Sequence, residues 1–166
     1  MIKHTIIRKL EHLWKAITDC AQVDPVINQE LEMIQDGTVI TWSVHDKGKI
    51  HVLSVVKETG GFRCAPHGPD QHRDDLWFHC DSADPLKQVL CAKAPLTYLI
   101  GRGAIIVCGS SSLTMGIIRL ISLSLPYRFG MRKARRIVPM ITEPVAFQRN
   151  RIRYLVQSIS RKREVS

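Results

Sequence analysis

The residues of this chain that could do chemistry are its cysteines, histidines and serines. Cys64 and His67 are two residues apart, with His72 and the pair His79–Cys80 beyond them. Thiolate and imidazole ligands from such a set could hold a tetrahedral zinc ion. The spacing matches no established zinc finger, however, and neighbouring residues of a strand point to opposite faces. We therefore favour a solvated, histidine-rich loop and expect no metal.

A serine or thiol nucleophile is the second chemical possibility. Ser110–Ser112 follow Gly109, but the chain has no G-x-S-x-G motif, and the serines are explained as the N-cap of a helix. The Gly-Arg-Gly run at 101–103 precedes a strand rather than a helix, so it lacks the geometry that cradles a phosphate. A hydrolase or thiol enzyme would have to use Ser110 or Cys64. We expect no catalytic residue and no cofactor.

The elements that must position these residues begin with helices. Apolar residues recur at helical spacing over 2–21, which predicts an amphipathic helix. Asp24-Pro25 is an N-cap followed by a favoured first-turn residue, so a second helix is predicted from there to Asp36-Gly37. Period-two alternation predicts a strand over 38–45, and a tight turn leads to further strands at 50–57 and 62–65.

The pattern over residues 76–125 predicts a strand, a capped helix to about Ala94 and an apolar link. A strand over 104–108 is predicted next, followed by an apolar helix over 112–125 that ends before Pro126. Arg119 is the only strongly polar residue of that last helix. Such a helix must be buried on several sides or cover an apolar molecule. Two basic helices are predicted to follow. The order predicts an α+β fold, with a curved, mainly antiparallel five-stranded sheet covered by helices on one face.

An ordered set of short motifs carries a resemblance to a known family. The set comprises Phe78-x-x-Asp81, Asp84-Pro85-Leu86, Ala94-Pro95, Gly101-Arg102, Ile105-Ile106-Val107, Cys108-Gly109-Ser110 and Leu113-Thr114-Met115, after an opening strand pair with Trp42 and Asp46. Over residues 25–125 the chain resembles the sterol carrier protein type 2 family. The resemblance implies a carrier, with a tunnel between sheet and terminal helices that holds a sterol, fatty acyl chain or similar apolar molecule without chemistry.

The apolar residues of this region exceed what one small sheet face needs for its own cover. A long acyl chain would gain on the order of 10 kcal/mol gross on burial, at ~0.8 kcal/mol per methylene. The alternative is that these residues form a dry core. The predicted ligand-binding residues are Trp42, Phe78, Leu99, Ile100, Ile106, Leu113, Ile117, Leu120 and Ile121.

The charge of the chain is segregated. Residues 1–126 hold 13 Lys/Arg and 13 Asp/Glu, whereas residues 127–166 hold 11 Lys/Arg and two Glu, so the net charge of +9 lies in the last forty residues. An apolar stripe within this basic segment is typical of a membrane-surface helix; the alternative is that the stripe packs on the domain. The predicted membrane-docking residues are Arg128, Arg132, Arg135, Arg136, Arg149 and Arg153.

These patterns predict an N-terminal amphipathic helix (1–24), a sterol-carrier-like domain (25–126) and a basic helical extension (127–166). We expect a non-enzymatic carrier whose partners are a lipid or other apolar small molecule and an anionic membrane surface. The alternative function is a nucleic-acid- or protein-binding adaptor that uses the basic tail, but the tail has no recognisable nucleic-acid motif. Five cysteines at irregular spacing, no secretory signal and no apolar run of ~18 residues favour a cytoplasmic, membrane-peripheral protein.

Overall fold

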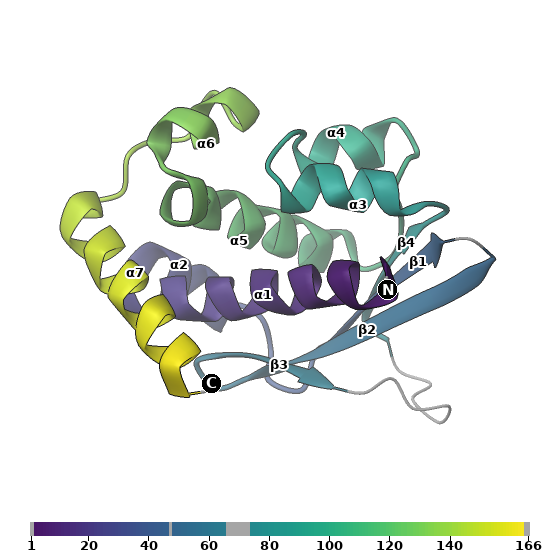
Figure 1. Ribbon diagram of the computed structural model, residues 1–166, viewed down its shortest axis with the longest axis horizontal. Coiled ribbons are helices and arrows are strands. Elements are labelled where there is room, and N and C mark those ends of the chain that lie inside the picture. The colour runs from purple at the N-terminus through teal and green to yellow at the C-terminus, as the bar shows by residue number, and fades with distance from the viewer. Residues whose placement is uncertain (1, 47, 66–73, 165–166) are drawn as a thin grey trace.

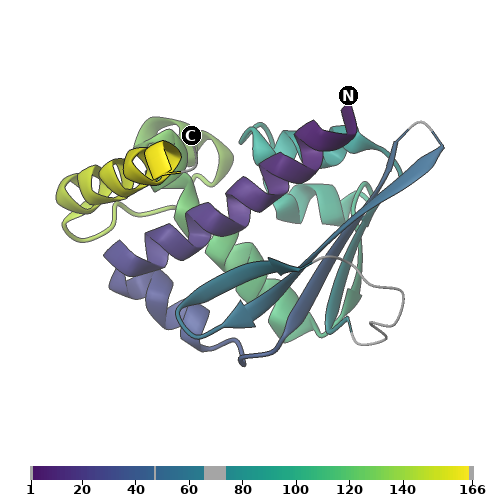
Figure 2. The same ribbon diagram turned by 60° about the horizontal axis from the view of Figure 1, so that its bottom comes forward.

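The computed structural model describes residues 2–46, 48–65 and 74–164, which form a sheet with helices on one face (Figures 1 and 2). The helices are α1 (Ile2–Val23), α2 (Pro25–Glu32), α3 (Ala83–Leu90), α4 (Leu96–Gly101), α5 (Ser111–Phe129), α6 (Met131–Ile137) and α7 (Phe147–Glu164). The strands are β1 (Val39–Asp46), β2 (Lys49–Glu58), β3 (Gly61–Ala65), β4 (Leu76–Cys80) and β5 (Ile106–Gly109). The predicted α+β class with five strands is confirmed.

The strands lie in the order β3-β2-β1-β4-β5. The pairs β1–β2, β2–β3 and β4–β5 are antiparallel. β1 and β4 pair in parallel, with Trp42 beside Phe78. The sheet is therefore mixed, which corrects one detail of the prediction. Alternation along a strand reports which face is buried, but it carries no information about the direction of the neighbouring strand.

The core lies between the sheet and the helices. Ile40, Trp42 and Val44 are fully buried, as the alternation of β1 predicts. The ring of Trp42 stacks on Phe78 with centroids 4.2 Å apart. The predicted amphipathic helix is confirmed as α1, which packs against strands β2 and β3 of the sheet (Figure 1). Its buried stripe consists of Ile6, Leu10, Leu13, Trp14 and Ile17.

The same core extends into the basic C-terminal segment. Tyr127, Phe147 and Tyr154 belong to the hydrophobic cluster that holds the sheet and α1, and the Tyr127 ring contacts both of the other two. Residues 1–24, 25–126 and 127–166 all contribute to this one core. The division of the chain into these three segments therefore remains a prediction from the sequence.

Helix α5 continues through Pro126 to Phe129, so the predicted end before Pro126 is wrong. A proline in a helix interior costs a hydrogen bond and crowds the preceding turn. Buried contacts hold the last turn in place, because Leu125 and Tyr127 are almost completely buried. The helix ends instead at Gly130, whose positive φ of 83° suits a glycine and whose N–H donates to the Pro126 carbonyl.

Asp36 supplies a pH-dependent contribution to stability. Lys57, whose ammonium is buried, donates to Asp36 Oδ1 at 2.8 Å, and Thr59 donates to Oδ2 at 2.7 Å. The hydrogen bond from Lys57 lowers the pKa of the Asp36 carboxyl below its ordinary 3.8. Because the folded pKa is lowered, this stabilisation is present above pH ~4 and is lost as the pH falls through the folded value.

We therefore expect Asp36→Asn to lower the urea midpoint at neutral pH, and the gap between variant and wild type to close on acidification below pH ~4. Urea unfolding followed by circular dichroism between neutral and acidic pH measures this. A gap that stays constant over the whole range would contradict the assignment.

Candidate functional site

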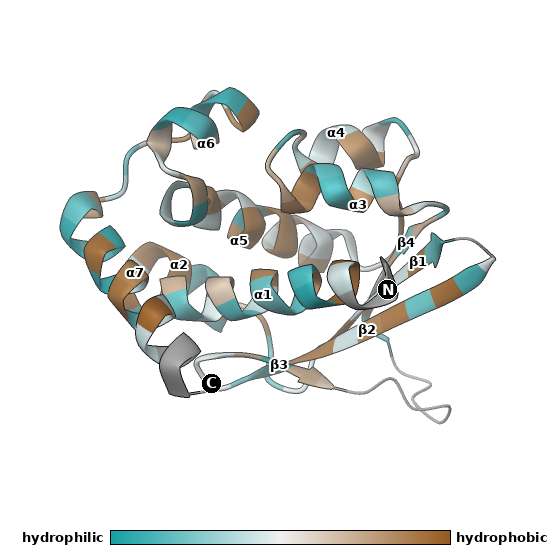
Figure 3. Ribbon diagram, viewed as in Figure 1, coloured by the Kyte–Doolittle hydropathy of each residue, from teal (hydrophilic) through white to brown (hydrophobic). Residues whose placement is uncertain are grey.

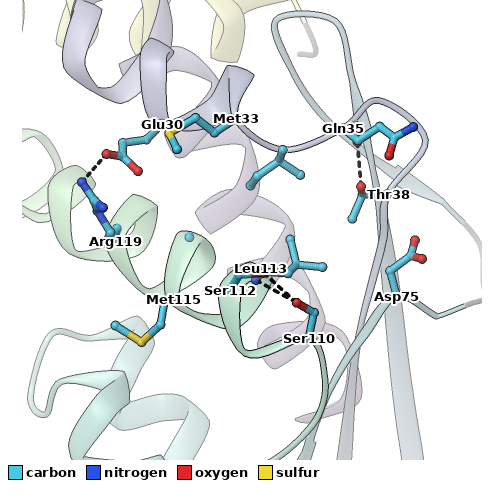
Figure 4. A pocket seen from close by; sticks show the side chains of 12 residues that line it. Glu30, Met33, Gln35, Thr38, Asp75, Ser110, Ser112, Leu113, Met115 and Arg119 are labelled. Carbon is cyan, nitrogen blue, oxygen red and sulfur yellow. Dashed lines mark hydrogen bonds and ion pairs between the residues drawn. The ribbon is translucent and has the colours of Figure 1, made fainter.

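An open cavity of about 650 Å³ lies between the C-terminal end of α2 and the first turns of α5. Ligand sites of small molecules typically occupy 300–1,000 Å³. Its apolar lining includes Met33 after α2, and Leu113 and Met115 on α5 (Figure 4). Ile34 and Gly116 also line it. Met33 and Met115 are 75% and 53% exposed, so the apolar surface continues to the mouth of the cavity. Methionine is flexible and polarizable, which suits a wall that adapts to its ligand.

Polar groups form the rim of this cavity. Arg119 of α5 donates to Glu30 of α2, which joins the two walls (Figure 4). Ser110 accepts the N–H of Leu113 and lies 2.8 Å from the Ser112 hydroxyl. The predicted capping role of Ser110 is thereby confirmed. Gln35, Thr38 and Asp75 also line the cavity. A cavity with apolar and polar sides can bind and orient an amphipathic molecule.

The predicted ligand-binding residues lie at different places in the fold. Leu113 lines the cavity. Ile100 is partly buried and packs against the core. Six others are almost or completely buried in the hydrophobic core and do not line the cavity, and these are Trp42, Phe78, Leu99, Ile117, Leu120 and Ile121.

Ile106 is placed differently from the other predicted residues. It pairs with His79 in the sheet and is 48% exposed, whereas Val107 pairs with Phe78 and packs against the core. Because adjacent residues of a strand point to opposite faces, Ile106 lies on the face without helices. Ile105 and Val107 are the inward residues, so the choice of Ile106 is wrong by one position.

Sequence reasoning missed Glu30, Met33, Ile34 and Met115 as cavity residues. Met33 and Ile34 come after the end of α2, and their apolar side chains beside a turn were the signal that could have found them. The Glu30–Arg119 pair joins residues far apart in the sequence, and no local pattern predicts it.

Two buried indoles in the core have unsatisfied donors. Trp14 Nε1 and Trp42 Nε1 have no acceptor among the described residues, although both side chains are fully buried. An unpaired buried donor costs about 1–3 kcal/mol. A polar atom of a guest molecule or a water could accept either bond.

The cysteine environments disfavour thiol chemistry. Burial raises the pKa of Cys64 to about 11 and the pKa of Cys80 to about 12, so both thiols are protonated at neutral pH. A thiolate is the reactive form. His67 and His72 of the suggested zinc set lie outside the described residues. Within 2–46, 48–65 and 74–164, no group of three or more potential ligands gathers.

Ser43, His79 and Asp81 form a hydrogen-bonded chain on the face without helices. Ser43 Oγ is 2.7 Å from His79 Nδ1, and His79 Nε2 is 3.1 Å from Asp81 Oδ1. Ser43 is buried beside Trp77, whose indole N–H donates to its hydroxyl at 2.8 Å. β1 is paired on both sides, so its N–H groups are engaged in the sheet rather than available to an oxyanion. We interpret this chain as structural.

The basic segment is only partly as predicted. Arg132, Arg135 and Arg136 of α6 are exposed, as are Arg149 and Arg153 of α7. Arg128 is half-buried, donates to the Leu90 carbonyl and lies over the Phe129 ring at 4.8 Å. Burial lowers the pKa of its guanidinium. Arg128 therefore serves packing at the end of α5, which corrects its assignment as a docking residue.

The apolar stripe of α7 faces solvent. Phe147, Asn150 and Tyr154 form the buried side of the helix. The opposite side is apolar and exposed, and consists of Ile152, Leu155, Val156 and Ile159. Figure 3 shows hydrophobic and hydrophilic residues interleaved along α7 at one end of the molecule. The alternative in which the stripe packs on the domain is therefore wrong.

The structure thus defines an α+β protein with helices on one face of a mixed sheet and an open cavity that both apolar and polar side chains line. Among the described residues, no helix is long and apolar enough to cross a membrane. No family model matches the chain. No curated protein matches it in sequence.

Solved structures with a similar arrangement are sterol carrier protein 2 domains, the family that the sequence resembles. A structure titled UbiJ-SCP2 ubiquinone synthesis protein is 19% identical, with 61% of this chain and 78% of that chain covered and a TM-score of 0.47. Sterol carrier protein 2 from Yarrowia lipolytica, in its apo form, is 19% identical over 67% of this chain and 88% of its own, also at 0.47. The sterol carrier protein domain of Helicoverpa armigera is 15% identical over 58% and 74%, at 0.47.

Proposed function

We propose that this protein is a non-enzymatic carrier that binds an apolar or amphipathic lipid in the cavity between α2 and α5 and exchanges it with anionic membranes. The observation that carries the proposal is the cavity itself, in which Met33, Leu113 and Met115 supply apolar surface beside polar groups of α2 and α5.

The energetics favour a reversible carrier. Each methylene buried in the cavity contributes ~0.8 kcal/mol. Association and ordering costs of at least ~4 kcal/mol oppose this gain and lead to micromolar affinity for a long chain. Release at a membrane is then feasible without chemistry. All five cysteines are free thiols, which suits a cytoplasmic setting.

The test is a titration of lipid-stripped protein with a fluorescent fatty acid, a fluorescent sterol and a short-chain quinone. We expect saturable micromolar binding of at least one probe, and native mass spectrometry should show a single bound molecule. Absence of binding for all three classes would overturn the carrier function.

Helix α7 supports the membrane part of the proposal. Its exposed side combines apolar residues, Ile152 and Val156 among them, with the exposed cations Arg149 and Arg153. Apolar side chains insert at the boundary between headgroups and acyl chains, and each cation near an anionic surface adds about 1 kcal/mol. The exposed stripe therefore has a bilayer surface as its matching partner.

We expect Ile152→Asp to lower sedimentation with phosphatidylserine-containing vesicles by at least about tenfold, because it removes ~1.5–3 kcal/mol of apolar insertion and adds a repelled charge. Ile50→Asp is the matched control, since Ile50 is similarly exposed (59% against 63%) but lies on β2. Truncation at 127 is unsuitable, because it removes Tyr127, Phe147 and Tyr154 from the core. Equal loss in both variants would refute docking through α7.

A further inference from the structure

A second cleft, of about 700 Å³, lies between α6 and residues 91–95, the segment that links α3 to α4. Four cations line it: Lys93 of the link and Arg132, Lys133 and Arg136 of α6. The ring of Phe129 also lines the cleft, with Lys133 Nζ 4.6 Å from its centroid. We define this feature as the α6 cleft. It is distinct in its lining from the cavity between α2 and α5.

Nothing nearby in the sequence neutralises the α6 cleft. Residues 85–142 contain nine Lys/Arg and no Asp or Glu. Among the described residues, the ion pairs of the structure do not involve Lys93, Arg132 or Arg136, and all three are exposed. Arg132 and Arg136 are four residues apart on one helix, and such like-charge pairs destabilise a helix. A bound anion would reverse this repulsion.

The fold holds Lys93 against α6. Ala92, Leu125 and Ala134 form a small buried cluster that docks α6 on the end of α3. Ala92 has a positive φ of 50°, a conformation that is unfavourable for a non-glycine residue. Its methyl group is buried in the cluster, and the next residue, Lys93, donates its N–H to the Gln88 carbonyl at 2.8 Å. The backbone at Lys93 is therefore held by packing and a hydrogen bond on the side of the cleft opposite the cations of α6.

The chemistry that matches the α6 cleft is a compact, multiply charged oxyanion. A phosphomonoester carries close to two negative charges and three strong acceptor oxygens, and guanidinium groups bind such oxygens in bidentate fashion. A carboxylate offers one charge and two oxygens, and so neutralises fewer of the four cations that line the cleft. Figure 1 shows α6 and α7 at the same end of the molecule, and the proposal below places one bilayer against both.

We propose that the α6 cleft binds the phosphomonoester headgroup of a membrane phospholipid and so selects the membrane on which the carrier docks. This inference rests on the membrane docking proposed above. It goes beyond that proposal because it predicts a preference for phosphomonoester lipids over other anionic lipids of the same surface charge.

The test compares vesicles of phosphatidylcholine with phosphatidic acid against vesicles with phosphatidylserine, matched by zeta potential, using the full chain. We expect the wild type to bind the phosphatidic acid vesicles on the order of tenfold more tightly. Lys93→Gln with Arg136→Gln should abolish that preference. Arg149→Gln with Arg153→Gln is the matched control, since it removes the same charge from α7 and should weaken binding to both vesicles equally. Thermal unfolding checks folding, and removal of repelling cations is expected to leave the midpoint unchanged or higher.

Several outcomes would overturn the inference. Equal binding of the wild type to both vesicles would mean that only diffuse charge attraction operates, while docking through α7 would stand. Binding of inorganic pyrophosphate as tight as vesicle binding would assign the cleft to a soluble phosphorylated ligand. Tighter binding of a single-stranded RNA than of either vesicle, with a steep salt dependence, would assign it to nucleic acid.

Discussion

Replacing Gly116 with tryptophan is expected to abolish lipid binding while leaving the fold intact. Gly116 lies on α5 and lines the cavity, and a Cβ added there meets nothing within 4 Å. The indole would then occupy the space of the ligand. Exclusion of only three methylene groups costs about 2.4 kcal/mol, which is a loss of about fiftyfold in affinity.

The chain offers a matched control for this variant. Gly101 ends α4 outside the cavity, and its added Cβ also meets nothing within 4 Å, so Gly101→Trp should bind lipid like the wild type. Gly116→Ala should bind as well and should be about 0.5–1 kcal/mol more stable, because glycine is a poor residue within a helix. Titration with a fluorescent lipid and urea unfolding measure the two effects. Unchanged affinity of Gly116→Trp would exclude this cavity as the ligand site.

Replacing Asp24 with alanine is expected to cost about 2–4 kcal/mol of unfolding free energy, through a lost helix cap and an unpaired buried hydroxyl. Asp24 Oδ1 accepts the N–H of Val26 at 2.8 Å and so caps α2. Its Oδ2 accepts the hydroxyl of Tyr127, on α5, at 2.6 Å. Burial, together with Asp24, raises the pKa of Tyr127, so this hydroxyl stays protonated and donates. One carboxylate thus joins the two helices that form the cavity walls.

Two further variants separate these contributions in urea unfolding. Asp24→Asn retains a good N-cap and is expected to lose less stability than Asp24→Ala. Tyr127→Phe keeps the cap and removes only the hydroxyl, at a cost of about 0.5–1.5 kcal/mol. A loss below about 0.5 kcal/mol for Asp24→Ala, the range of an ordinary surface substitution, would contradict the bridging role.

The sequence by itself determined the features that depend on neighbouring residues. The caps at Asp24 and Ser110 were predictable because a side chain that accepts a backbone N–H two or three residues ahead is a local interaction. The inward face of β1 and the buried stripe of α1 followed from periods of two and 3.6. The separation of a neutral body from a basic extension is a property of composition alone.

Only the tertiary structure decided which segments meet. It paired β1 with β4 in parallel, brought the end of α2 to the start of α5 to form the cavity, and turned the apolar stripe of α7 away from the core. It placed the half-buried Arg128 against the Leu90 carbonyl and carried α5 through Pro126, against the local preference. These features depend on contacts between residues distant in the sequence, whose free energy outweighs local propensity but leaves no periodic trace along the chain.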